Sequence, residues 1–326
     1  MSAGSADRPD ANWRPTASLT ALKRRASLKQ LVRRFFHHRQ VLEVDVPLMS
    51  AGANTDPAMQ PVLVDDGSGR PRFLHTSPEF ALKRLLAQFA EDVYFLGPVF
   101  RAGESGRQHN PEFHMLEWYR CGMDHRALAK ETVALVREAC QRPDWPCHWL
   151  SYAEAFQQAV ALDPLHASDQ AIAKTAADHG LSDADACSRR QCLDFLMATV
   201  VAEQFDRNAL TVLLDFPADQ AALARLLPGD PPLAARFELY AGTLELANGY
   251  HELCDALELE QRIDAEQQQL AERGLRARPA DQRWLAAQRH GLPDCAGVAL
   301  GFDRLVMLAE GTLHIHDILA FPAERA

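Results

Sequence analysis

The sequence lacks several features that would each assign it to a particular class of protein. No apolar run is long enough to cross a bilayer, and the opening MSAGSADRPDANWRPTASLT contains no apolar signal core. None of the seven cysteines forms a CxxC pair, so neither a zinc site nor a disulfide framework is indicated. No internal repeat or low-complexity linker divides the chain. We therefore expect a cytoplasmic protein without a membrane partner.

Positive charge is also scarce. Lys and Arg total 34 against 44 Asp and Glu, which gives a formal net charge of -10 and an isoelectric point near 5.7. Because an acidic surface repels phosphate backbones, we expect no stable nucleic-acid partner. The 47% hydrophobic and 24% charged residues are typical of a globular protein, and 326 residues fit one large core.

Residue spacing predicts an α+β fold in which helices flank an antiparallel sheet. A helix over 16–40 leads into a short strand that ends before Pro47, and DDGSGR is the turn of a hairpin. Ser77, Pro78 and Glu79 begin the next helix. We expect residues 1–15 to be flexible and 16–326 to form one domain with a helical insertion around 125–205. Later strands are predicted at 93–101, 112–121, 210–216, 236–250 and 297–300, and helices at 255–273 and 303–309.

Two segments have the residue types needed to bind a nucleotide. In the strand–loop–strand that begins FRAGE and continues HNPEF, Arg101 can bind a phosphate, Glu104 or loop amides can contact adenine, and Phe113 can stack on the base. In GVALGFDRL, small residues allow a ligand to approach the backbone, and Arg304 would direct a second guanidinium at a polyphosphate. Taken singly, a solvated hairpin and an ordinary glycine turn explain these segments equally well or better.

Together the two segments resemble motifs two and three of class II aminoacyl-tRNA synthetases, and the first helix and strand resemble motif one, the usual dimer-forming element. HNPEF, ELANGYHEL and GLPDCAGVALGFDRLVML resemble the lysyl branch. An anticodon-binding barrel would need on the order of 100 residues before motif one, so we expect a core without one. Such a core, with SPEF, FRAGE and GVALG, is similar to the elongation factor P (R)-β-lysine ligase family.

The resemblance implies an ATP-dependent enzyme with Mg²⁺ as cofactor. Its expected catalytic residues are Arg101 and Arg304. The expected ATP contacts are Arg101, Ala102, Gly103, Glu104, His109, Asn110, Phe113, Glu245, Leu246, Gly301 and Arg304. The expected amino-acid pocket comprises Ser77, Pro78, Glu79, Tyr119, Glu252 and Ala299, and the expected metal ligands are Glu245 and Glu252. The partners it implies are β-lysine, elongation factor P and a second copy of the chain in a homodimer.

Three points stay open at this level. Lysyl synthetases usually read FRNE, whereas FRAGE places Glu104 one position later, so the residue that contacts adenine is not fixed. Glu245 and Glu252 would lie on opposite faces of a strand unless Asn248 and Gly249 bend the chain. Ala299 stands where lysyl synthetases have glycine, so its methyl group either disfavours α-lysine or only packs the strand.

The expected reaction forms an aminoacyl adenylate, which a lysine amine of elongation factor P then attacks. Two alternatives remain. A truncated synthetase could charge tRNA, although the acidic composition counts against it. A non-catalytic sensor of ATP and amino acid would be expected to lose a phosphate-binding arginine, yet both Arg101 and Arg304 are present.

Overall fold

A nine-stranded sheet forms the centre of the computed structural model, which describes residues 13–326. The strand order is β1-β5-β6-β12-β11-β10-β8-β7, and β9 pairs with β10. The pairs β1–β5 and β7–β8 are parallel, and all the others are antiparallel. This arrangement confirms the expected α+β fold. Most of the expected flexible segment 1–15 lies outside the described residues.

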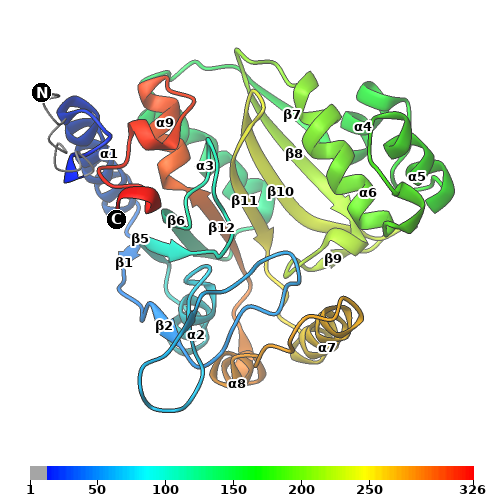
Figure 1. Ribbon diagram of the computed structural model, residues 1–326, viewed down its shortest axis with the longest axis horizontal. Coiled ribbons are helices and arrows are strands. Elements are labelled where there is room, and N and C mark those ends of the chain that lie inside the picture. Colours follow the sequence, from blue (N-terminus) through cyan, green and yellow to red (C-terminus); the bar gives the residue numbers. More distant parts are fainter. Residues whose placement is uncertain (1–12) are drawn as a thin grey trace, which may run out of the picture.

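The elements follow the chain as shown in Figure 1. The main-sheet strands are β1 (Leu42–Glu43), β5 (Val93–Phe100), β6 (Glu112–Cys121), β7 (Cys147–Ser151), β8 (Leu210–Pro217), β9 (Leu226–Leu227), β10 (Leu233–Ala241), β11 (Leu244–His251) and β12 (Cys295–Gly301). A small sheet contains β2 (Met49–Ser50), β3 (Leu63–Val64) and β4 (Arg72–Leu74). The α-helices are α1 (Leu19–His37), α2 (Glu79–Phe89), α3 (His125–Ala139), α4 (Tyr152–Val160), α5 (Asp169–Asp178), α6 (Arg189–Leu196), α7 (Ala256–Glu272), α8 (Gln282–Gly291) and α9 (Phe302–Glu310).

Two expected elements differ from the observed ones. The single strand expected over 236–250 is the hairpin β10–β11, because the chain turns at Gly242, whose φ of +57° favours glycine. The stretch 125–204 is mostly helical but also contains β7, which adds an edge strand beside β8. Because β7 has only five residues and lies between two helices, the sequence pattern did not distinguish it from the helical segments around it.

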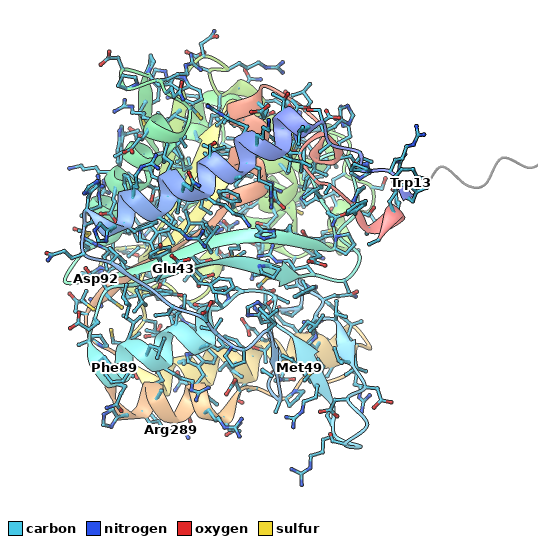
Figure 2. The ribbon with its side chains drawn as sticks, turned by 90° about the vertical axis from the view of Figure 1, so that its left-hand side faces the viewer. Trp13, Glu43, Met49, Phe89, Asp92 and Arg289 are labelled. Carbon is cyan, nitrogen blue, oxygen red and sulfur yellow. The ribbon has the colours of Figure 1, made fainter. Side chains whose placement is uncertain are left out.

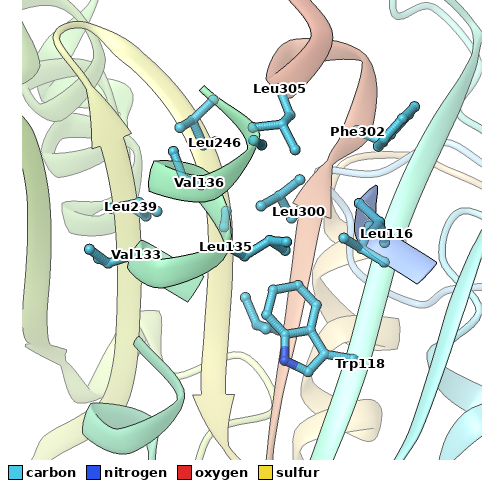
Figure 3. Close-up of a cluster of buried hydrophobic side chains, with 14 of the residues drawn as sticks. Leu116, Trp118, Val133, Leu135, Val136, Leu239, Leu246, Leu300, Phe302 and Leu305 are labelled. Carbon is cyan, nitrogen blue, oxygen red and sulfur yellow. The ribbon is translucent and has the colours of Figure 1, made fainter. Parts of the chain in front are cut away.

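Helices cover both faces of the sheet around β5 and β6. On one face α1, α3 and α9 bury the main core, in which Trp118, Leu135 and Leu300 are fully buried (Figure 3). On the other face α2 packs against β5 and β6, with α8 next to it (Figure 2). Because side chains alternate along a strand, β12 presents Leu300 to the core and its neighbours to the opposite face.

Helices α4, α5 and α6 form a second cluster on β8 and β10. Tyr152 and Phe156 of α4 stack on one another, and Phe216 of β8 completes this aromatic group. The cluster places the start of α6 beside the open face of the central strands. Within residues 13–326, no helix has both the length and the apolar character needed to span a bilayer.

Candidate active site

The open face of the central strands contains a cavity of about 440 Å³. Strands β6, β11 and β12 form its base, and the loop after β5 and the start of α9 form part of its wall. The predicted site residues that line it are Ser77, Glu79, Arg101, Glu104, His109, Asn110, Phe113, Tyr119, Glu245, Leu246, Glu252, Ala299, Gly301 and Arg304. Three predicted residues, Pro78, Ala102 and Gly103, do not line the cavity.

Strand register brings the two halves of the site together. β12 lies between β6 and β11, so Gly297 is opposite Tyr119, and Ala299 is opposite both Glu117 and Asn248. Residues that are far apart in the sequence therefore share one face of the sheet. Ala299 lies on this face and lines the cavity. Its expected effect on amino-acid selectivity stays a prediction.

One end of the cavity holds both predicted phosphate-binding arginines. Arg304 donates to the carbonyl oxygen of Glu245 at 2.8 Å and lies 2.8 Å from Nε2 of His109. Burial and the charge of Arg304 lower the pKa of His109, so its neutral ring accepts this hydrogen bond. The Arg101 guanidinium lies 5.2 Å from the ring centre of Phe113 and 3.4 Å from Glu104. The side chains of Arg101 and Arg304 are 24% and 22% exposed, so both are partly enclosed by the cavity wall.

The start of α9 is held by a buried carboxylate. Asp303, the residue before Arg304, is 1% exposed and accepts a hydrogen bond from the backbone N–H of His114 at 3.0 Å. Its second oxygen lies 2.5 Å from Arg25 of α1. Asp303 thus joins α9 to β6 and α1, which positions Arg304 against the strands.

Asn110 holds the loop between β5 and β6. Its amide donates to the carbonyl oxygen of Glu112 at 2.6 Å and accepts from the backbone N–H of Ala323 at 3.0 Å. These bonds fix the backbone between Glu104 and Phe113. A direct contact of Asn110 with ATP stays a prediction.

The other end of the cavity has an acidic floor that consists of Glu79, Glu117 and Glu252, with Lys83 and Tyr119 beside them. The Lys83 ammonium lies 2.7 Å from Glu79 and 2.6 Å from Glu252. Glu117 accepts from the Tyr119 hydroxyl at 2.9 Å. Lys83, Glu117 and Glu252 are each at most 3% exposed. Burial of ionised groups is costly unless they are paired, and these contacts supply most of the pairing.

Burial changes the proton affinities of the floor. It raises the pKa of Glu117 to about 8, and the nearby charge of Glu79 adds to the effect. Burial also raises the pKa of Glu252, to about 7, although the Lys83 ammonium opposes this shift. The floor therefore titrates near neutral pH and gains negative charge as the pH rises.

The helix that carries Glu79 begins differently from the expected cap. Pro78 occupies the N-cap position, and the Ser77 hydroxyl accepts from the backbone N–H of Glu79 at 3.0 Å. The same hydroxyl donates to Glu117 at 2.6 Å. Ser77 therefore stabilises the start of the helix and also supports the floor. A role in the helix start and a role in the amino-acid pocket are thus compatible.

Sequence reasoning missed several residues of the site. Glu117 is two positions before Tyr119 on the same strand face, and Lys83 is one helical turn after Glu79, so both spacings could have indicated them. Arg236 and Glu238 of β10 form a buried ion pair next to the cavity. No local pattern marks this pair, because β10 reaches the site only through its pairing with β11.

The two expected metal ligands have different neighbours. The Glu245 side chain is 43% exposed and lies near Arg304, whereas Glu252 is buried against Lys83. Among residues 13–326, no group of three or more His, Cys, Asp or Glu side chains could hold a metal ion by itself. The assignment of Glu252 as a metal ligand stays a prediction. A metal ion at Glu252 would have to compete with the Lys83 ammonium, which lies 2.6 Å from its carboxylate.

The fold and the site define a class II synthetase catalytic domain, and the model of the family "tRNA synthetases class II (D, K and N)" matches residues 10–325. Three similar proteins are named elongation factor P--(R)-beta-lysine ligase. The protein from Vibrio cholerae is 43% identical over 97% of this chain and 99% of its own, and that from Vibrio parahaemolyticus is 42% identical over 95% and 98%. The protein from Salmonella paratyphi B is 43% identical over 97% and 99%. The chain belongs to the elongation factor P (R)-β-lysine ligase family, which confirms the resemblance seen in the sequence.

Proposed function

We propose that this enzyme activates (R)-β-lysine with ATP as an adenylate and transfers it to a lysine side chain of elongation factor P. The acidic floor is the observation that supports a diamino acid as substrate, and the named relatives support (R)-β-lysine among the diamino acids. Its three acids, Glu79, Glu117 and Glu252, outnumber the single ammonium of Lys83, and a bound ammonium group would favour the ionised forms of Glu117 and Glu252. The floor therefore complements a substrate with two ammonium groups, which only a diamino acid supplies. We expect the enzyme in the cytoplasm, together with this translation factor.

In this proposal, one end of the cavity binds the amino acid and the other binds ATP during the first step. The diamino acid binds on the floor, and its carboxylate attacks the α-phosphorus of ATP so that pyrophosphate leaves. Arg101 and Arg304 stabilise the negative charge that develops on the phosphoryl oxygens. In the second step, the acceptor amine attacks the adenylate carbonyl and AMP leaves. No enzyme nucleophile is required.

Glu245 is the best-placed residue to bind Mg²⁺ together with ATP, because it is partly exposed beside Arg304. Burial raises the pKa of Glu238, and the nearby charge of Glu245 raises it further. Both residues line an adjoining cavity. Mg²⁺ is commonly bound by one or two carboxylates plus phosphate oxygens, so Glu245 could hold it together with the polyphosphate, whereas Glu238 and Glu252 are each paired with a buried cation. When bound, the ion would neutralise charge on the polyphosphate.

The enzyme acts as a homodimer in this proposal, with motif one at the interface. Large apolar side chains are exposed on the face that carries α1, including Trp13, Met49 and Phe89 (Figure 2). A second copy would remove this surface from water, which is favourable. Sedimentation equilibrium at micromolar concentration should give twice the chain mass of 36.2 kDa. A fully active monomer would contradict the proposal.

One acceptor experiment separates the proposed function from its alternatives. The enzyme is incubated with ATP and either α-lysine or (R)-β-lysine, and then with purified elongation factor P or tRNA. Mass spectrometry should show one β-lysyl addition to elongation factor P. Charging of tRNA would indicate a truncated synthetase, and the absence of ATP–pyrophosphate exchange with both amino acids would indicate a sensor.

A further inference from the structure

Charged residues surround the place where the active-site cavity meets two other cavities. Asp56 and Arg190 line both the active-site cavity and an outer cavity of about 710 Å³. Asp194 lines this outer cavity and a third one of about 330 Å³. Asp56 lies in the loop after β2, whereas Arg190 and Asp194 belong to α6. We call the junction between this loop and α6 the mouth of the site.

The loop side of the mouth is fixed from behind. The Arg278 guanidinium donates to the carbonyl oxygens of Asn54, Asp56 and Met59 at 3.3, 2.8 and 2.5 Å. The Thr55 hydroxyl also donates to Glu266 of α7 at 2.5 Å. These contacts hold the backbone, and the Asp56 carboxylate itself accepts a hydrogen bond from the backbone N–H of Ala58 at 2.8 Å, which defines its position at the mouth.

The α6 side of the mouth is held loosely. Arg190 lies 3.9 Å from Asp56 and 3.6 Å from Asp194, and its side chain is 38% exposed. These separations exceed the 2.6 and 2.7 Å of the buried Lys83 pairs in the floor. A long ion pair between partly exposed side chains contributes little to stability. Another cation can therefore replace Arg190 on Asp56 at small cost.

The position of the mouth fits the second substrate. The amino acid occupies the floor and ATP the end with Arg101 and Arg304, so the acceptor amine must arrive between them from an open side. The mouth is such a side, since Asp56 lines the same cavity as the floor residue Glu79. The outer cavity carries both signs of charge and is large enough for side chains around an acceptor lysine.

We propose that the acceptor lysine of the protein substrate enters through this mouth and that its ammonium replaces the Arg190 guanidinium on Asp56. Exchange of one cation for another keeps the Asp56 carboxylate paired while the lysine passes. This assignment rests on the proposed function, because it concerns only the transfer step.

The test compares the two half-reactions in Asp56→Asn. ATP–pyrophosphate exchange with (R)-β-lysine is measured without acceptor, and transfer is measured with increasing elongation factor P. The variant should raise the KM for elongation factor P about tenfold, the loss expected for one charged hydrogen bond, and should reduce transfer much more than exchange. Asp264→Asn is the matched control, because Asp264 is exposed on α7 and lines none of these cavities. It should transfer like the parent.

Arg190→Gln distinguishes recognition from simple support of the loop. If Arg190 competes with the acceptor for Asp56, this variant should have an unchanged or lower KM for elongation factor P. An increase in KM like that of Asp56→Asn would overturn the proposal, since the pair would then only hold the mouth together. Equal losses of exchange and transfer in Asp56→Asn would also overturn it. If the proposed function itself is wrong, the parent enzyme will show no exchange with β-lysine. That result differs from every outcome in which only a variant changes.

Discussion

Gly297 of β12 has no space for a side chain, so Gly297→Ala should damage amino-acid binding more than any other part of catalysis. A Cβ at this position would lie 2.3 Å from Cε1 of Tyr119 and 2.5 Å from Oε1 of Glu252. Tyr119 and Glu252 are 2% and 1% exposed, and both belong to the site floor or its edge. Because both side chains line the cavity, the added methyl group would push them toward the space that the substrate occupies.

The expected magnitude follows from the cost of overpacking. An extra methyl group in a packed interior typically costs about 1–3 kcal/mol. If displacement of Tyr119 and Glu252 transfers that cost to substrate binding, kcat/KM for (R)-β-lysine falls by roughly 5- to 150-fold. Most of this change should be an increase in KM, because Arg101 and Arg304 at the other end of the cavity keep their contacts.

ATP–pyrophosphate exchange at varied β-lysine and varied ATP separates these effects. The KM for ATP should change little, and thermal unfolding reports whether the clash instead destabilises the whole domain. Gly106→Ala is the control, because nothing lies within 4 Å of a Cβ at that position. A Gly297→Ala enzyme with the parental KM for β-lysine and the parental melting temperature would refute the assignment of this floor to the amino acid.

Further predictions concern the rest of the cavity. Arg304→Ala should lose about 3 kcal/mol of transition-state stabilisation, a roughly 150-fold decrease in exchange kcat/KM, and equal rates for variant and parent would exclude a phosphate-binding role. Ala299→Gly should increase the exchange kcat/KM for α-lysine relative to that for β-lysine. The change in this ratio should correspond to at most about 3 kcal/mol, since one methyl group gives limited discrimination. If the ratio stays constant, selectivity is determined by other residues. The KM for β-lysine should fall as the pH rises from about 6 to 8, because burial raises the pKa values of Glu117 and Glu252 and only their ionised forms attract ammonium groups. Glu117→Gln should flatten part of this pH profile, and an unaltered profile would show that another group titrates.

Local patterns in the sequence were enough to locate the main elements and the nucleotide-binding end. The hairpin β5–β6, the strand β12 and the helix α9 all follow from short-range periodicity and turn residues. Arg101 and Arg304 could be identified because each lies within a short motif at the end of a strand. The same reasoning failed for β7 and for the turn at Gly242, where the local signal is brief.

The acidic floor and the mouth depend on contacts that no local pattern describes. Lys83 of α2, Glu117 of β6 and Glu252 after β11 meet only because β12 pairs with both β6 and β11 in one particular register. A shift of β12 by one residue would turn its own side chains over, so that Gly297 and Ala299 would no longer face the cavity between Glu117 and Glu252. The sequence by itself therefore determined the family, most of the main strands and the candidate phosphate-binding arginines. Only the tertiary structure decided which carboxylates share the buried lysine, because strand pairing places distant residues within hydrogen-bonding distance.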